Sequence, residues 1–198
     1  MKLTLTEENI LGKGTNKIVY YHPEDADKCI KFSLDSSNET DMQHELRFRR
    51  ICKDMIAQST LLTKYYGTVD TNLGTGHVFE LVRDYDGRLS ETFLELLLRE
   101  KTSPAVYKAL AMFKEKLFEE QVITYKIFPD NFMVEKISAQ EIRIRIIDGI
   151  GMHVLIPLAY YSKTIAKRRQ KRIWKEFMKR LCEEYGLTGD IWTQLGTV

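Results

Sequence analysis

The sequence predicts an α+β protein in which a five-stranded antiparallel sheet with one helix precedes a mainly helical half containing a β-hairpin. In the first third, short β-branched and aromatic runs alternate with glycine and proline, which is typical of strands joined by tight turns. Beyond Arg83, apolar residues recur at helical spacing. The chain has 198 residues, 43% of them hydrophobic, enough for one domain or two tightly packed lobes.

The expected elements before Arg83 are three strands, one helix and a hairpin. The strands are expected at residues 10–11, 17–21 and 28–32. Apolar residues at helical spacing then predict a helix from about residue 39 to 57. A glycine-rich turn at 72–76 separates runs 65–69 and 77–82, which predicts a β-hairpin.

The second half is expected to begin with two helices. Ser90 is expected to cap the first, which contains Phe93 to Leu98, and Ser103-Pro104 opens the second. Runs 132–134 and 142–147 alternate well enough to predict a hairpin that ends at Asp148. A mostly helical tail follows.

Composition restricts the function classes only partly. The net charge of +2 argues neither for nor against an anionic partner. The three cysteines are odd in number and widely separated, so they form neither a disulfide framework nor a metal-ligand pair, and reduced thiols in a cytoplasmic protein are expected. We expect neither a signal peptide nor a membrane-spanning segment.

Three residues of the first half suggest a phosphate-binding site. Gly12 and Gly14 lie between the first two strands, where glycine lets backbone N–H groups approach phosphate oxygens, although turn geometry explains such glycines about as often. Lys31 lies in the third strand among apolar neighbours. Its position after the glycines favours phosphate binding over a solvated outer face.

An acidic residue on the following helix is expected to pair with Lys31. Glu45 falls mid-helix among apolar positions, and we prefer it to Glu39, which suits the helix start. The alternative for Glu45 is a surface ion pair with Arg49 at the i+4 position.

Asn131 and Asp148 are the candidate metal ligands. One amide and one carboxylate from adjacent hairpin ends suffice for Mg²⁺, which also takes phosphate oxygens and water. An isolated Asp-Gly is usually only a turn, but this one follows a hydrophobic strand downstream of Pro129-x-Asn131.

The order of these motifs resembles the protein kinase superfamily. The glycine loop, strand lysine, helix glutamate, Pro-x-Asn and strand-end aspartate follow one another as they do there. The resemblance implies an abridged bilobal kinase-like fold, with residues 1–83 as N-lobe and 84–198 as C-lobe, and ATP and Mg²⁺ as ligands. More narrowly, the sequence resembles the YrbL family of bacterial proteins, associated with the PhoP regulatory network. The motifs of that resemblance are 22–26, 29–31, 66–69, 74–76, Pro129-x-Asn131 and 155–159.

One departure from the kinase pattern affects the chemistry. Lys126 occupies the position of the proton-accepting aspartate, and Phe128 that of the lysine two positions later. An ammonium cannot accept a proton unless its pKa falls by several units. The direct interpretation is that the chain has lost phosphoryl transfer. In the alternative interpretation, Lys126 supplies positive charge to the γ-phosphate and Asp130 orients the acceptor hydroxyl.

Three functions remain open at this point. The leading one is a Mg-ATP-dependent phosphotransferase acting on a protein or small molecule. The second is a pseudokinase, an ATP-binding regulatory or scaffold protein without phosphoryl transfer. The third is a nucleotidyl transferase that binds ATP in the opposite orientation.

The basic segment 163–180 is expected to form an amphipathic helix. In one interpretation the helix only closes the core with its apolar face and its lysines are solvated. In the other, its basic face docks an acidic partner. An anionic membrane remains open as the docking partner, whereas nucleic acid is less favoured because no aromatic stacking platform accompanies the charges.

Overall fold

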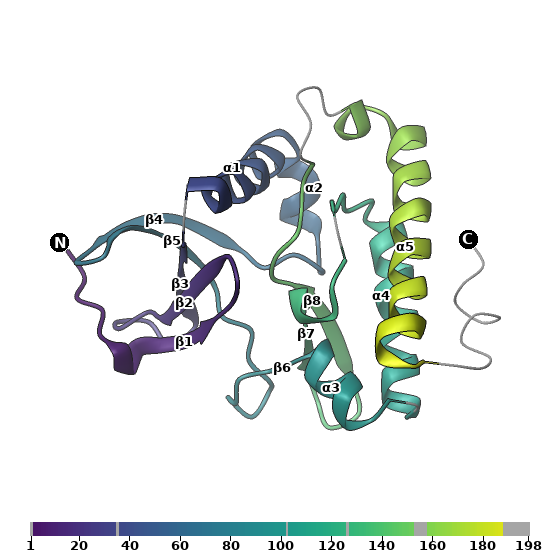
Figure 1. Ribbon diagram of the computed structural model, residues 1–198, viewed down its shortest axis with the longest axis horizontal. Coiled ribbons are helices and arrows are strands. Elements are labelled where there is room, and N and C mark those ends of the chain that lie inside the picture. The colour runs from purple at the N-terminus through teal and green to yellow at the C-terminus, as the bar shows by residue number, and fades with distance from the viewer. Residues whose placement is uncertain (1, 35, 102, 126, 153–157, 188–198) are drawn as a thin grey trace.

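The computed structural model describes residues 2–34, 36–101, 103–125, 127–152 and 158–187, without the side chains of 36–39. The chain folds as a mixed α+β protein with two antiparallel sheets and several helices (Figure 1). The first half contains β1 (Ile10–Lys13), β2 (Lys17–Tyr21), β3 (Lys28–Ser33), α1 (Ser36–Ile51), α2 (Lys53–Gln58), β4 (Tyr65–Thr71) and β5 (Gly74–Glu80). The second half contains β6 (Glu91–Thr92), α3 (Phe93–Arg99), α4 (Pro104–Glu119), β7 (Phe132–Lys136), β8 (Ile142–Ile146) and α5 (Lys163–Tyr185).

The expected five-stranded sheet is confirmed, with strand order β1-β2-β3-β5-β4 and antiparallel pairing throughout. Ile30 and Val78 lie opposite each other and share one apolar cluster with Leu3 and Leu5. The residues that alternate with them, among them Phe79, belong to another cluster with Met42 of α1. The central strand β3 therefore has both faces covered, and the face toward α1 also carries Lys31.

Close packing on this sheet requires a glycine at position 76. A Cβ atom there would lie 2.4 Å from Ile30 Cγ2 and 2.7 Å from Phe32 Cζ. We expect Gly76→Ala to lower the free energy of unfolding by about 1–3 kcal/mol, because the packed side chains must shift. Denaturant unfolding measures this, with Gly12→Ala as the control, since a Cβ at Gly12 meets nothing within 4 Å. Equal stability of the two variants would contradict the expectation.

Two helix predictions need correction. The helix expected over 39–57 is divided into α1 and α2, because Cys52 leaves helical geometry at φ −100° and ψ 30°. The residue that caps α3 is Thr92 and not Ser90: the Thr92 side chain accepts a hydrogen bond from Glu95 N, and Glu95 reciprocates. Ser90 instead donates to Asp84 at 2.6 Å. The expected start at Ser103-Pro104 is confirmed.

The predicted hairpin is confirmed as β7 and β8, and the two-residue strand β6, which was not predicted, extends it to three strands. Phe132 at the start of β7 stacks on Phe93 of α3 and Phe113 of α4, with ring centroids 4.8 and 4.5 Å apart. Trp174 and Phe177 of α5 complete this aromatic core. In Figure 1, α4 and α5 lie side by side on the side of the hairpin away from the large sheet.

The predicted amphipathic character of the tail is confirmed by α5, whose buried side chains include Ala166, Ile173 and Leu181. Ile165, an apolar residue in the first turn of this helix, is exposed and does not lie on the buried face. Among the described helices, none combines the length and apolar content needed to cross a lipid bilayer.

Candidate functional site

A cavity of about 910 Å³ lies between the five-stranded sheet and the β7–β8 hairpin. Its lining comes from both halves of the chain. It brings together most of the residues proposed from the sequence, namely Gly12, Gly14, Lys31, Asp130, Asn131 and Asp148. Glu45 is not among the lining residues, and Lys126 lies outside the described part of the chain.

The hairpin places Asn131 and Asp148 next to each other in space, at the same end of two paired strands. Asn131 ends a short 3₁₀ turn that leads into β7, and Asp148 follows two residues after β8. Phe132 pairs with Ile146, and the Ile147 N–H donates to the Asn131 carbonyl at 2.9 Å. Both side chains therefore reach the cavity from the same end of one hairpin.

Lys31 points from the sheet to the end of this hairpin. Its ammonium donates to the Ile147 carbonyl at 2.6 Å and lies 4.4 Å from the centroid of the Phe79 ring. Lys31 is only 7% exposed, so it is not a solvated outer-face lysine. Because a buried ammonium without such partners is costly, these contacts fix the Lys31 ammonium at Ile147, the residue before Asp148.

Lys17 is a site residue that the sequence analysis missed. It begins β2, is 8% exposed, and its Nζ lies 2.6 Å from Asp148 Oδ1. The Gly149 N–H donates to the same oxygen at 2.7 Å. The signal that could have found Lys17 is strand alternation: Lys17 and Val19 share a face of β2, and Val19 pairs with Lys31.

The two lysines control the charge on Asp148. Burial alone would raise the pKa of Asp148, but the ammonium groups of Lys17 and Lys31 outweigh it and hold the pKa below its ordinary value. Burial also raises the pKa of Tyr125, with Asp148 and Asp41 adding to the shift. Tyr125 is thus a neutral phenol that donates to Asp41 at 3.4 Å. The inner end of the cavity combines an ionised carboxylate, two ammonium groups and a hydroxyl.

The expected pair between Lys31 and Glu45 does not form among the described residues. Glu45 is 2% exposed, and its Oε1 accepts from Arg49 Nε at 2.9 Å and Nη2 at 2.8 Å. Arg49 Nη1 also donates to the Thr63 carbonyl at 2.9 Å. Arg49 lies one helical turn after Glu45 and pairs with its carboxylate. The alternative i+4 ion pair is therefore present, but it is buried and not at the surface.

Backbone geometry does not require glycine at positions 12 and 14. Neither residue has the positive φ found at six other glycines, such as Gly67 and Gly74. A Cβ at Gly12 would meet nothing within 4 Å, and one at Gly14 only the Lys17 carbonyl at 3.8 Å. Turn geometry therefore does not account for these glycines, which favours close approach of a ligand.

The loop before β7 is anchored by α5. Arg180 lies over the Phe128 ring at 4.2 Å and donates to the Ile127 carbonyl at 3.3 Å. Asp130, two residues after Phe128, is exposed and lines the cavity. Asp130 is therefore available to a molecule that enters from solvent, whereas Asp148 is only partly exposed and contacts Lys17.

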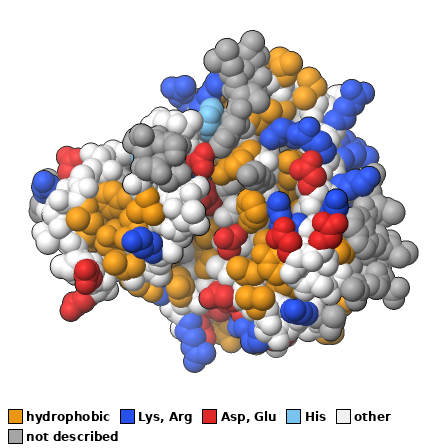
Figure 2. All heavy atoms as spheres, in the orientation of Figure 1, with side chains coloured by type: hydrophobic (Ala, Val, Ile, Leu, Met, Phe, Trp, Pro, Cys, Tyr) orange, Lys and Arg blue, Asp and Glu red, His pale blue; other side chains and the backbone are white. Residues whose placement is uncertain are grey.

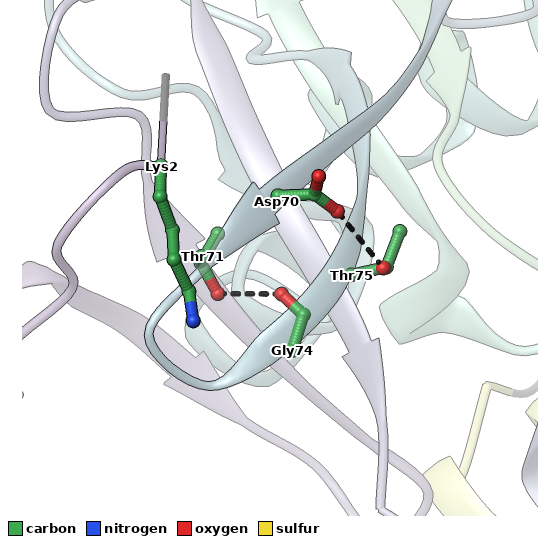
Figure 3. A pocket seen from close by; sticks show the side chains of 5 residues that line it. All are labelled: Lys2, Asp70, Thr71, Gly74 and Thr75. Carbon is green, nitrogen blue, oxygen red and sulfur yellow. Dashed lines mark hydrogen bonds between the residues drawn. The ribbon is translucent and has the colours of Figure 1, made fainter.

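A second hollow of about 300 Å³ at the β4–β5 turn does not qualify as a functional site (Figure 3). Thr71 donates to the Gly74 carbonyl and Thr75 to Asp70, so the polar groups there hold the turn itself together. None of the residues proposed from the sequence lines it. The described residues also contain no cluster of three or more His, Cys, Asp or Glu side chains suited to a metal ion.

The exposed face of α5 is basic over its first half. Blue side chains gather at the upper right of Figure 2, where this part of α5 lies. The exposed basic residues before the first acidic residue of the helix, Glu176, are Lys163, Lys167, Arg168, Lys171, Arg172 and Lys175. Of these, Arg172 pairs with Glu176 at the i+4 position, and farther along Lys179 and Arg180 face Glu183 and Glu184 in the same way.

These features define an α+β protein with a cleft that is cationic at its inner end. Residues 3–182 match the family model described as PhoP regulatory network protein YrbL. The chain is 31% identical to "Uncharacterized protein YrbL" of Escherichia coli (strain K12) over 194 residues, covering 96% of this chain and 92% of that protein. The same values hold for the Shigella flexneri protein of that name. The chain therefore belongs to the YrbL family.

Proposed function

We propose that this chain is a kinase-like phosphotransferase that binds ATP in the cleft and transfers its γ-phosphoryl group to a hydroxyl of a protein or small molecule. In this proposal residues 1–83 and 84–198 are the two lobes of an abridged kinase-like fold. The observation that carries it is the convergence of Lys31, Asn131 and Asp148 on one cavity beside Gly12 and Gly14.

Each group has a role in this chemistry. The Lys31 ammonium binds the α- and β-phosphates, and the open backbone around Gly12 and Gly14 allows N–H groups to approach phosphate oxygens. The amide of Asn131 and the carboxylate of Asp148 are hard oxygen donors of the kind that Mg²⁺ takes beside phosphates and water, and Lys17 already occupies that carboxylate. When bound, Mg²⁺ would neutralise charge on the transferring group.

Asp130 is the group proposed to bind the acceptor. It is exposed at the cavity, so its carboxylate can orient an incoming hydroxyl and take up its proton. Lys126 supplies positive charge to the γ-phosphate in the proposal. Positioning and charge are the main requirements of phosphoryl transfer, which makes this replacement of the usual base workable.

Incubation with γ-labelled ATP and candidate acceptors tests the proposal. Label on an acceptor that disappears in Asp130→Asn, while ATP binding persists, supports it. Unchanged transfer in that variant removes Asp130 from the mechanism. A parallel incubation with α-labelled ATP that labels the acceptor identifies a nucleotidyl transferase instead.

The glycine geometry gives a prediction that separates binding from stability. We expect Gly12→Ala/Gly14→Ala to keep the free energy of unfolding within about 1 kcal/mol, because neither added Cβ meets a close neighbour. ATP affinity should fall about tenfold, because the methyl groups occupy space that phosphates need. Calorimetric titration and denaturant unfolding measure the two quantities. Unchanged affinity would mean that phosphates do not approach these positions.

A second candidate function is an ATP-binding regulatory protein without transfer. The basic first half of α5 favours it, because its six exposed cations, of which Arg172 pairs with Glu176, follow one another without an intervening acidic residue and suit an acidic partner protein. Binding of ATP without label on any acceptor, together with a partner lost on charge reversal of Lys167 and Lys171, would favour this function over transfer.

A further inference from the structure

We propose that Lys17 substitutes for a divalent metal ion in ATP binding, so that the cleft binds the triphosphate without Mg²⁺. This inference rests on the proposed ATP site. It identifies Lys17 as a second phosphate-binding lysine beside Lys31, and it gives Asp148 a cationic partner that is part of the chain.

The position of Lys17 is built into the sheet. Lys17 pairs with Ser33 across β2 and β3, and Val19 pairs with Lys31, so the two lysines are diagonal neighbours on one sheet face. Both ammonium groups extend to the end of the β7–β8 hairpin, one to Asp148 Oδ1 and the other to the Ile147 carbonyl, each at 2.6 Å. Both lysines line the same cavity.

Charge balance assigns the role of Lys17. Lys17 and Lys31 together carry two positive charges against the single negative charge of Asp148, so the inner end of the cleft remains cationic toward phosphate oxygens. Without Lys17, Asp148 would cancel Lys31, and a cation from solution would be needed to offset the carboxylate. In phosphate-binding sites, a metal ion commonly supplies this positive charge.

Four other acidic side chains line the cleft, and none of the contacts described for them reaches Lys17 or Lys31. Each either has a partner of its own or lies at the exposed mouth. Asp41 accepts from Tyr125, Glu80 pairs with Arg145, Glu95 caps α3 through Thr92, and Asp130 is exposed.

Burial makes Lys17 a strong competitor for a metal ion at Asp148. The Lys17 side chain is buried at 10% exposure, whereas the Asp148 side chain keeps 28%, so water is excluded mainly from the ammonium side of the ion pair. A metal ion would have to lose part of its hydration shell and also displace a buried ammonium, which would then need another partner. Phosphate oxygens can instead bind the remaining N–H groups of Lys17 while its contact with Asp148 persists.

Titration of a non-hydrolysable ATP analogue, in excess EDTA and in excess Mg²⁺, tests the inference in wild type and Lys17→Met. We expect the wild-type dissociation constant to change less than about threefold between the two conditions. In Lys17→Met, affinity in EDTA should fall at least about tenfold, and Mg²⁺ should restore most of it. Lys17→Arg keeps the charge and should behave as wild type.

Two further variants make the outcomes decisive. Lys53→Met removes an exposed lysine of α2 that does not line the cavity, and it should leave both dissociation constants unchanged. Adding Asp148→Asn to Lys17→Met should restore affinity in EDTA, because the uncompensated carboxylate is gone. Wild-type binding that requires Mg²⁺ would overturn the role of Lys17 and leave the ATP site intact, even if Lys17→Met failed to fold. Absence of binding in both conditions would overturn the ATP site itself.

Discussion

Asp148→Asn is expected to lower the rate of phosphoryl transfer about 10²–10³-fold, the usual cost of removing one charged or hydrogen-bonding group from a reacting phosphate or oxyanion site. Asp148 is the carboxylate on which Lys17 and the Gly149 N–H converge. The asparagine side chain keeps the size of the aspartate but carries no charge. Transfer would therefore lose the carboxylate that orders the cations around the phosphates.

Single-turnover transfer of labelled γ-phosphate measures this effect, with Asp86→Asn as the matched control. Asp86 is an exposed aspartate that contacts Arg88 in a turn and does not line the cavity. ATP binding in EDTA should persist in Asp148→Asn, because both lysines remain. Transfer at the wild-type rate would remove Asp148 from the reaction, and with it the proposed enzyme.

Local sequence patterns predicted most of the fold. The β-branched runs gave the five strands, and Ser103-Pro104 gave the start of α4, because both signals depend on the backbone preferences of a few neighbouring residues. The division between α1 and α2 at Cys52 was not predicted, since the apolar spacing continues across it. Such a break depends on how two segments pack against the rest of the chain.

The candidate site was predictable only where position along the chain fixes the partner. Asn131 and Asp148 come together because a hairpin joins them. Lys17 and Asp148 are 131 residues apart, and their contact depends on how the large sheet faces the hairpin. Glu45 shows the opposite case: it could pair with either Arg49 or Lys31, and the nearer residue on the same helix satisfied it.

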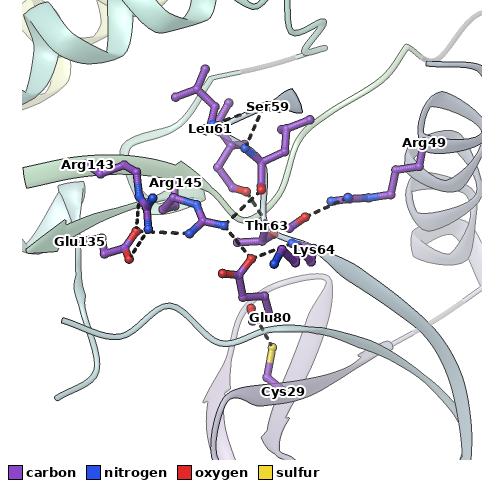
Figure 4. A network of polar contacts seen from close by, with 12 residues as sticks. Cys29, Arg49, Ser59, Leu61, Thr63, Lys64, Glu80, Glu135, Arg143 and Arg145 are labelled. Atoms are coloured by element: carbon purple, nitrogen blue, oxygen red, sulfur yellow. Dashed lines mark hydrogen bonds and ion pairs between the residues drawn. The ribbon is translucent and has the colours of Figure 1, made fainter. Parts of the chain in front are cut away.

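Arg145→Met is expected to lower the free energy of unfolding by about 3–5 kcal/mol, because it removes a buried arginine and leaves the Glu80 carboxylate without its cation. Arg145 joins the two sheets: its Nη2 lies 2.6 Å from Glu80 Oε2 of β5 and 3.2 Å from the Leu62 carbonyl (Figure 4). Its Nη1 lies 3.3 Å from Glu135 Oε2 of β7. The melting temperature should fall by about 2–4 °C for each kcal/mol lost.

Arg143→Met on the same strand is the matched control. The Arg143 side chain is 39% exposed and, among the residues that the structure describes, pairs only with Glu135, so its loss should cost at most about 1 kcal/mol. Thermal and denaturant unfolding of both variants compare a buried arginine with a half-exposed one in the same network. Equal losses would mean that burial does not decide the contribution of Arg145.

The pH dependence identifies the source of the Arg145 effect. Burial alone would raise the pKa of Glu80, but Arg145 and the Lys64 N–H outweigh it and hold the pKa below the ordinary value of 4.5. A lowered pKa stabilises the folded state above the unfolded pKa, and this contribution disappears as the pH falls through the folded pKa. The difference in stability between wild type and Arg145→Met should therefore shrink as the pH falls below the pKa that the Glu80 carboxyl has in the unfolded chain. A difference that stays constant into strong acid would assign the loss to packing of the arginine stem and not to its charge.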